Sequence, residues 1–423
     1  MLDLGDIQGL VFSGYARAPQ ARYFRLLFGG VGAAEWLSRV LPRITTSERR
    51  ERGSGRRFNV AFTASGLRAL GLPESALATF PAPFLRGMHA PELAARLGDH
   101  DKNSPKAWEF GGSEGRHFDA LVLSYAATAT ELDDESDVLE DGFERFGIEA
   151  EIEDVYLPAD QRGHFGFLNA RTNPSVRGGP GWWRKRRLVR PVAAGEFVLG
   201  YKDATGHYAE SPVAPVRAGA RALPRAVDSL RAMDLGRNGT FLALRKVAQD
   251  VAGFWRWAER IGAKMWPDAG DERARRVAEA IVGRTRDGEP LGPACPVGAH
   301  AERARHHPLI RRGRLYGPKV ALGSDPDDTP RGLMFIALCA DLERQFGLLY
   351  EAGLNNPKFG GLTHERDPLV GMRTGAADDT FSLQGEPFRR TERLEPFVRV
   401  RGGAYLFMPG LRALSYLAEG GPP

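Results

Sequence analysis

The alternation of strand-like and helix-like stretches most strongly constrains the fold of this 423-residue chain. Residues 58–63 and 120–125 have the apolar pattern of strands, and an acidic stretch at about 130–146 has helical spacing. Strands interleaved with helices in one unit are typical of a ferredoxin-like α+β arrangement. The same half is predicted to contain strands at 8–12 and 22–28, a helix at 32–41, and a short helix capped by Ser65 that ends at Gly71.

The second half repeats this architecture without repeating the sequence. It is predicted to contain strands at 239–247, 333–338, 398–401 and 404–408, with helices at 251–258, 272–282, 341–350 and 411–417. A connector at about 172–191 is rich in Gly, Pro and Arg, which marks a boundary. The sequence therefore predicts two ferredoxin-like domains, at residues 1–180 and 190–423.

Composition excludes several classes of protein. No run approaches the roughly 18 apolar residues of a membrane span. The chain enters Leu2-Asp3-Leu4-Gly5-Asp6 without a basic and apolar leader, so we expect a cytoplasmic protein that contacts no membrane. Two cysteines exclude a disulfide framework and fit a reducing compartment.

The charge distribution argues against nucleic-acid binding. The net charge of +5 is modest for this length, and the arginines are interleaved with acids. One basic run, Arg184-Lys185-Arg186-Arg187, follows two tryptophans. It could attract an anionic partner, but a solvated loop with a buried tryptophan is the more ordinary interpretation.

Two short segments carry the chemistry. The first is Cys295-Pro296-Val297-Gly298-Ala299-His300, in which Pro and Gly fix the backbone and leave little bulk before the histidine. The second is Arg311-Arg312-Gly313-Arg314-Leu315-Tyr316-Gly317. A lone histidine in a loop is more often structural than a ligand, so these residues alone decide little.

Both segments resemble motifs of the dye-decolorizing (DyP-type) heme peroxidases, namely C-P-x-G-A-H and R-R-G-x-x-Y-G. The resemblance extends from Leu4-Gly5-Asp6-Ile7-Gln8-Gly9 to Arg401-Gly402-Gly403-Ala404-Tyr405, with further landmarks in family order. It implies two ferredoxin-like halves, with heme held mainly by the C-terminal one. Because Cys295 is not part of a C-x-x-C-H motif, the implied heme b is non-covalent.

The resemblance also implies a role for each site residue. His300 would ligate the iron, with its other ring nitrogen bonded to Asp367 as first choice or Asp341 as second. Arg311 would stabilise the hydroxide that leaves when hydrogen peroxide is cleaved. Leu333 and Phe335 would cover the distal heme face, although a plain core role suits their strand equally well. The partners implied are hydrogen peroxide and a small organic reductant; a homo-oligomer is compatible with the sequence, which leaves the oligomeric state open.

One position departs from the family pattern. The family's distal aspartate lies in G-x-x-D-G, and in the matching residues 166–174 Asn169 takes its place and Ala170 replaces the glycine. An amide cannot carry a proton, and loss of a general base costs roughly 10²- to 10⁴-fold in rate. His164 is interpreted as structural. Two functions stay open: a peroxidase with weakened distal chemistry that relies on Arg311, or a heme-binding oxidase, carrier or sensor without peroxidase turnover.

Overall fold

The structure is a computed structural model that describes most of the chain. The described residues are 1–30, 32–48, 55–168, 173–185, 191–216, 223–226, 232–291, 307–358, 365–373, 379–383, 389–390 and 393–419. Two residues predicted for the site, Asn169 and His300, lie outside these ranges. Across the described residues, every helix is too short or too polar to cross a bilayer.

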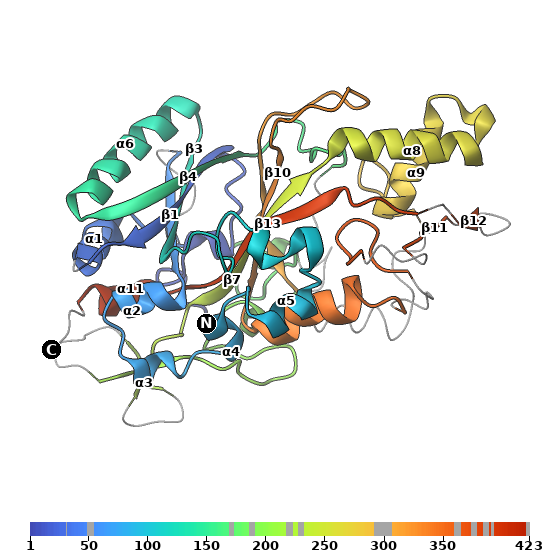
Figure 1. The fold of residues 1–423 in the computed structure, drawn as a ribbon. Coiled ribbons are helices and arrows are strands. Elements are labelled where there is room, and N and C mark those ends of the chain that lie inside the picture. The colour runs from blue at the N-terminus through green and yellow to red at the C-terminus, as the bar shows by residue number, and fades with distance from the viewer. Residues whose placement is uncertain are drawn as a thin grey trace.

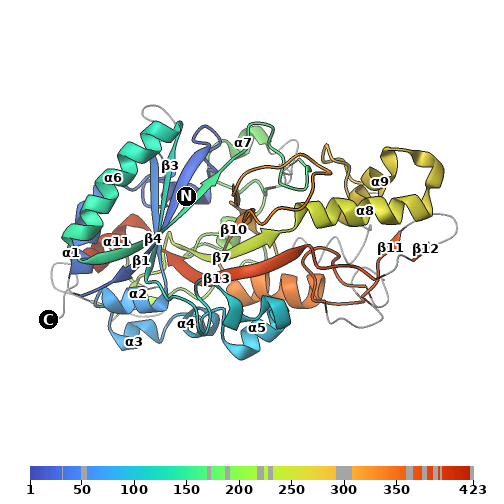
Figure 2. The ribbon, with the colours of Figure 1, turned by 45° about the horizontal axis from the view of Figure 1, so that its top comes forward.

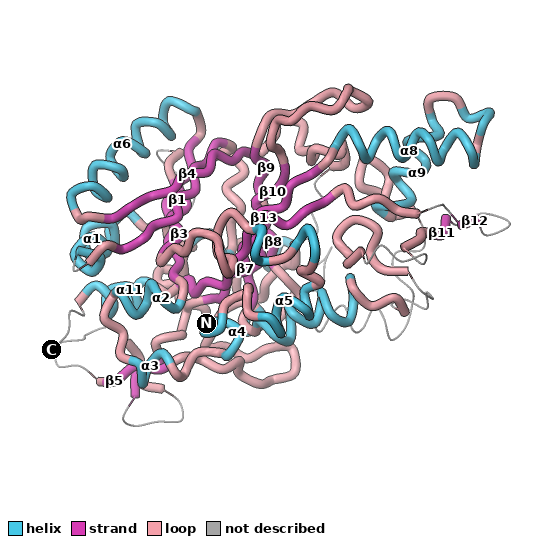
Figure 3. The backbone as a smooth tube through the Cα atoms, viewed as in Figure 1, coloured by secondary structure: helices cyan, strands magenta, loops and turns pink. Residues whose placement is uncertain are grey.

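The centre of the molecule is a ring of antiparallel strands (Figure 3). Its order is β7-β13-β2-β3-β1-β4-β9-β10-β8, and an additional pairing of β7 with β10 closes it. The first half of the chain contributes β1 (Gln20–Phe28), β2 (Arg57–Phe62), β3 (Ala120–Ala126) and β4 (Ile148–Tyr156). The second half contributes β7 (Thr240–Gln249), β8 (Ile310–Arg311), β9 (Arg314–Tyr316), β10 (Gly332–Cys339) and β13 (Val398–Met408).

The two groups of strands meet at two narrow seams. At one seam β2 pairs with β13 through Phe62 and Phe407 alone. At the other, β4 pairs with β9 through Tyr156 and Leu315 alone. Ladder hydrogen bonds are therefore few where the halves join, and side chains must supply much of the connection.

The buried side chain of Gln8 ties the first seam together. Its Nε2 donates to the carbonyl oxygens of Val60 and Pro409, each at 2.9 Å, and so reaches both halves. Its Oε1 accepts from the backbone N–H of Val60 at 3.0 Å and from Asn59 Nδ2 at 3.1 Å. One carboxamide thus satisfies four partners at a position that is 1% exposed.

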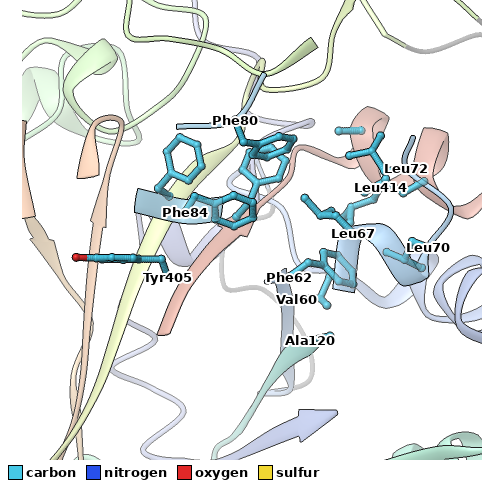
Figure 4. Close-up of a cluster of buried hydrophobic side chains, with 14 of the residues drawn as sticks. Val60, Phe62, Leu67, Leu70, Leu72, Phe80, Phe84, Ala120, Tyr405 and Leu414 are labelled. Carbon is cyan, nitrogen blue, oxygen red and sulfur yellow. The ribbon is translucent and has the colours of Figure 1, made fainter. Parts of the chain in front are cut away.

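Because side chains alternate along a strand, the ring has an inner and an outer face. The inner face holds a core built from both halves, with Leu123 and Tyr125 meeting Leu244 and Ile336. The outer face is covered by helices, and Figure 4 shows Phe62 from β2 beside Leu67 and Leu414 from two of them. A residue's position in the strand register therefore decides whether its side chain lies on the inner or the outer face of the ring.

Helices lie at both ends of the molecule and along the side between them. Figures 1 and 2 show α1 and α6 at one end of the molecule and the packed pair α8 and α9 at the other. The α helices with described bounds are α1 (Gly32–Val40), α2 (Ala64–Ala69), α3 (Glu74–Leu77), α4 (Ala82–Arg86), α5 (Pro91–Leu97), α6 (Ala129–Arg145), α7 (Trp182–Lys185), α8 (Val251–Met265), α9 (Glu272–Val282) and α11 (Leu411–Ala418).

Shorter elements complete the fold. They are the 3-10 turns η1 (Gly9–Val11), η2 (Leu41–Arg43), η3 (Asp101–Asn103), η4 (Pro105–Ala107), η5 (Ala194–Glu196) and η6 (Pro267–Ala269), the π-helical turns η7 (Leu342–Gly347) and η8 (Leu349–Leu354), and the short strands β5 (Val213–Pro215), β6 (Ala232–Asp234), β11 (Ser382–Leu383) and β12 (Arg389–Arg390).

Most of the predicted elements are confirmed, and three details were wrong. In the predicted strand at 8–12, residues Gly9–Val11 form the turn η1 instead, because the carbonyl of Gly9 accepts from the N–H groups of Phe12 and Ser13. The cap of α2 is Thr63, whose hydroxyl accepts from the N–H of Gly66 at 3.2 Å, and not Ser65. The two predicted C-terminal strands are one strand, β13, with an irregularity between Val400 and Gly402. The sequence did not predict β4, β8 or β9, and the proposed domain boundary stays a prediction.

Substitution of Gln8 tests how much its side chain contributes to the seam between β2 and β13. Replacing Gln8 with Leu leaves buried N–H and C=O groups without partners, so we expect the free energy of unfolding to fall by about 2–5 kcal/mol. The measurement is urea denaturation. Gln20→Leu, at the partly exposed start of β1, is the control and should change stability by less than about 1 kcal/mol. Equal losses in the two variants would contradict a special role for Gln8.

Candidate functional site

The register of β8 places Arg311 on the outer face of the ring. Arg311 lies opposite Ala337 of β10, and Ile310 lies opposite Leu338. Cross-strand partners point to the same face. Since Ala337 packs in the outer core and Leu338 in the inner one, Arg311 faces outward.

The two following arginines of the run point the other way and have structural roles. Arg312 donates from Nε to the carbonyl of Leu10 at 2.7 Å and from Nη2 to that of Val11 at 2.8 Å. Burial lowers the pKa of Arg312 to about 10, which still leaves it charged at neutral pH. Arg314 donates from Nη1 to the carbonyl of Pro19 at 2.7 Å and lies 4.7 Å from the ring centroid of Tyr125. Both arginines hold the N-terminal segment against the second half.

A second cation shares the surroundings of Arg311. Partial desolvation by neighbouring protein atoms lowers the pKa of Arg311, which stays exposed on the surface, and repulsion from Arg284 lowers it further. Arg284 follows the end of α9 and donates from Nη1 to the carbonyl of Gly288 at 3.0 Å. Two like charges in one region create a positive potential, so this part of the outer face suits an anion or a group that becomes negative during a reaction.

Leu333 and Phe335 lie on the same face as Arg311, along β10. Both are partly exposed, whereas Met334 and Ile336 on the inner face are fully buried. A Cβ added to Gly313 would lie 3.2 Å from Leu333 Cδ1, so a larger residue there would crowd Leu333. Next to Arg311, the strand thus presents an apolar surface that the described residues cover only in part.

A cavity of about 430 Å³ lies beside this surface. It does not include Arg311, Leu333 or Phe335, but it includes Arg245 and Val247, the cross-strand partners of Phe335 and Leu333. Its volume is within the range of ligand pockets. The remaining lining residues are Leu97, Gly98, Asp99, His100, Asp101, Lys102, Asn103, Tyr350, Leu369, Val370, Gly371, Arg373, Asp379, Arg393, Leu394, Glu395, Pro396, Val398, Arg399 and Val400.

Asp367 and Asp341, the two predicted partners of His300, occupy different places. Asp367 Oδ1 accepts from the N–H groups of Leu369 at 3.0 Å and Val370 at 2.9 Å, and both of these residues line the cavity. Asp341 caps η7, accepting from the N–H of Arg344 at 2.9 Å, and lines a separate hollow. Because His300 lies outside the described residues, its pairing with either carboxylate stays a prediction.

A buried ion pair that the sequence did not predict supports the cavity floor. The guanidinium of Arg245 binds Asp99, and the two side chains are 1% and 2% exposed. The same guanidinium lies 5.1 Å from the ring centroid of Tyr350 and 5.9 Å from that of Trp108. The only sequence signal was a charged residue in the middle of an apolar strand. Breaking such a pair by removing one partner is costly, so it fixes β7 against the segment that follows α5.

His164 is structural, as predicted. Its ring is buried, and its Nε2 lies 3.0 Å from the carbonyl oxygen of Tyr316, the last residue of β9. Burial lowers the pKa of His164, which favours the neutral imidazole. The imidazole of His164 therefore connects the loop before Asn169 to β9, the strand that follows Arg311.

The described residues fit the cofactor that the sequence resemblance implies. Heme is a flat apolar disk with carboxylate groups at one edge. Leu333 and Phe335 offer an apolar surface, and Arg373 and Arg393 are among the cations of the adjoining cavity. An apolar surface beside cations is the environment that such a molecule requires.

Comparison with known proteins gives one consistent result. No protein-family model matches the chain. The chain is 24% identical over 484 residues to the dye-decolorizing peroxidase msp1 of Mycetinis scorodonius, an alignment that covers 98% of this chain and 87% of the relative. It is 29% identical over 231 residues to the multifunctional dye peroxidase DyP2 of Amycolatopsis sp., covering 42% and 49% of the two chains.

The fold comparison agrees. A solved fungal DyP-type peroxidase from Auricularia auricula-judae superposes with a TM-score of 0.74 at 20% identity, covering 99% of both chains. At this identity the likeness shows the fold, and it confirms the predicted α+β class with its two ferredoxin-like halves. Sequence and fold together confirm the resemblance first indicated by the motifs.

Because Arg311 and Arg312 point to opposite faces, replacing each with Met should lower the free energy of unfolding by different amounts. Arg312→Met leaves the carbonyls of Leu10 and Val11 without their donor, so stability should fall by about 2–4 kcal/mol. Arg311→Met, at an exposed position, should change it by less than about 1 kcal/mol. Urea denaturation of the heme-free proteins measures both, and a larger loss for Arg311→Met would contradict the assigned orientations.

Proposed function

We infer that this chain belongs to the dye-decolorizing peroxidases and that it is a heme peroxidase, which reduces hydrogen peroxide to water with electrons from a small organic reductant. The observation that carries the proposal is the position of Arg311. The register of β8 turns it to the outer face beside Leu333 and Phe335, whereas Arg312 and Arg314 have structural roles. A dye-decolorizing peroxidase that aligns with 98% of this chain at 24% identity supports the same function.

We propose heme b, held without a covalent bond, as the cofactor that supplies the redox chemistry. His300 would ligate its iron, and Asp367 would hold the other ring nitrogen of His300 in one tautomer. Leu333 and Phe335 would pack against the disk. The cations of the cavity, among them Arg373 and Arg393, suit its carboxylates.

In this proposal Arg311 supplies the main electrostatic stabilisation on the distal side. When the bond between the two oxygens of peroxide breaks, negative charge develops on the departing oxygen. A positioned guanidinium would stabilise that charge. Asn169 would bind peroxide or water through its amide but would move no proton. Peroxide cleavage would therefore be slower than with an aspartate at this position.

A heme-binding protein without appreciable peroxidase turnover is the second candidate, and Asn169 is what favours it. A specialised oxidase, a carrier or a sensor would need the same pocket but no proton shuttle. The outcome of adding peroxide to the heme-loaded protein separates the two functions. The proposal also includes a cytoplasmic location, which the content of only two cysteines supports.

The first experiment is heme reconstitution followed by peroxide. The reconstituted protein should show a Soret band that requires His300 and that shifts on adding one equivalent of hydrogen peroxide. His300→Ala should lose this band or shift it, because the iron loses its protein ligand. A band that peroxide leaves unchanged would support the second candidate, and failure to bind heme would exclude both.

The second experiment varies the distal residues. Arg311→Leu should lower kcat/KM for peroxide by roughly 10²- to 10³-fold, because a stabilising charge is lost. Asn169→Asp should raise it, by up to roughly 10²-fold or more, because a proton carrier is restored.

Arg68→Leu is the matched control, since Arg68 is an exposed residue of α2 paired with Glu74. It should leave kcat/KM unchanged. Steady-state kinetics with a phenolic reductant measures all three variants. Equal effects of Arg311→Leu and Arg68→Leu would exclude the proposed role of Arg311.

A further inference from the structure

The open edge of β8 is occupied by a side chain that acts like one more strand residue. β8 pairs with β10 on one side, and Arg312 N–H donates to the carbonyl of Ile336 at 2.8 Å. In an antiparallel pair alternate residues bond to opposite sides, so the backbone groups of Arg311 point away from β10. There, Arg311 N–H donates to Asn173 Oδ1 at 2.7 Å, and Asn173 Nδ2 donates to the carbonyl of Arg311 at 3.0 Å.

The two bonds require a carboxamide of this length. Its planar group offers one acceptor and one donor side by side, as a neighbouring peptide does. Aspartate would provide two acceptors and would place an oxygen against the carbonyl of Arg311. Glutamine would retain both groups but on a longer side chain. Pro174 restricts the backbone of Asn173 to extended conformations, which limits the positions from which its side chain can reach β8.

Asn173 is close to Asn169 in the sequence and bonds to Arg311 in the structure, and these are the two residues predicted for the distal side. Asn173 is four residues after Asn169 in the chain, and its side chain holds the backbone of Arg311. The loop is also fixed before Asn169, where the N–H of Leu168 donates to the carbonyl of Arg286 at 2.9 Å. A displacement of Asn173 would therefore change the position of β8 relative to Leu168.

We propose that Asn173 is a positioning residue that sets the location of Arg311 through its backbone and thereby controls the rate at which the site cleaves peroxide. The catalytic half of this statement rests on the proposed function. The structural half, that Asn173 holds the edge of β8, does not. Both hydrogen bonds are exposed, so substitutions of Asn173 should leave the protein folded.

The heme-free protein tests the structural half. Hydrogen–deuterium exchange of a peptide spanning residues 309–313 should be faster in Asn173→Asp than in the unsubstituted protein, by roughly 3- to 10-fold at the Arg311 amide. Asn356→Asp is the matched control. Asn356 also precedes a proline, and it also bonds backbone groups on both sides, donating to the carbonyl of Ala352 at 3.3 Å and accepting from the N–H of Lys358 at 2.9 Å. Unchanged exchange in Asn173→Asp would overturn the proposal.

The heme-loaded protein tests the catalytic half. Asn173→Asp should lower kcat/KM for peroxide by roughly 10- to 100-fold, because misplacement of a catalytic group is costly. KM for the organic reductant should stay unchanged. Asn173→Gln should recover part of the rate, and Asn356→Asp should lose none.

A double-substitution cycle shows whether Asn173 acts through Arg311. In an Arg311→Leu background Asn173→Asp should have no further effect on kcat/KM, because the group that it positions is gone. Additive losses would overturn the proposal. If the unsubstituted heme-loaded protein does not reduce peroxide, the proposed function fails and the catalytic half with it, while the exchange experiment still decides whether Asn173 holds Arg311.

Discussion

Closure of the strand ring is the constraint on which the rest of the structure depends. The ring is assembled from strands of both halves, but in the part of the chain that the structure describes each of the two strand ladders that join them contains one residue pair. Side chains strengthen these junctions: Gln8 bonds β2 and the end of β13, while Tyr156 donates from its hydroxyl to the carbonyl of Gly317 at 3.0 Å. A buried group with every hydrogen bond satisfied holds such a junction, and the same group with a missing partner would destabilise it.

Once the ring is closed, the alternation of side chains assigns functions to neighbouring residues. In the run of three arginines around Gly313, Arg312 and Arg314 reach carbonyl groups of the N-terminal segment, while Arg311 is left on the outer face. The same alternation along β10 gives Met334 and Ile336 to the inner core and Leu333 and Phe335 to the outer surface. The ring thereby creates a face that combines apolar side chains with an outward-facing cation, and the proposed heme site rests on this combination.

Charges of both signs surround that face. Arg311 is close enough to Arg284 for their repulsion to lower its pKa, and the adjoining cavity is lined by both arginines and carboxylates. In the proposed site an aspartate at position 169 would carry a proton, whereas the amide of Asn169 would not. In the proposed mechanism the site would depend more on electrostatic stabilisation and on the location of Arg311, whose backbone is bonded by the exposed amide of Asn173.

The sequence by itself determined the α+β class, the type of most elements and the family resemblance, because these follow from local periodicity and short motifs. Through the family resemblance it also named Arg311, Leu333 and Phe335 as site candidates, but local periodicity did not show which arginines of the run face outward. The tertiary structure decided that through strand register, a pairing between residues far apart in the chain. It likewise made Gly9–Val11 a turn and placed the side chain of Gln8 between β2 and the end of β13. It also brought Asn173 to β8 and Asp99 to Arg245. These contacts join residues 138 and 146 positions apart, and no local pattern encodes a partner at that distance.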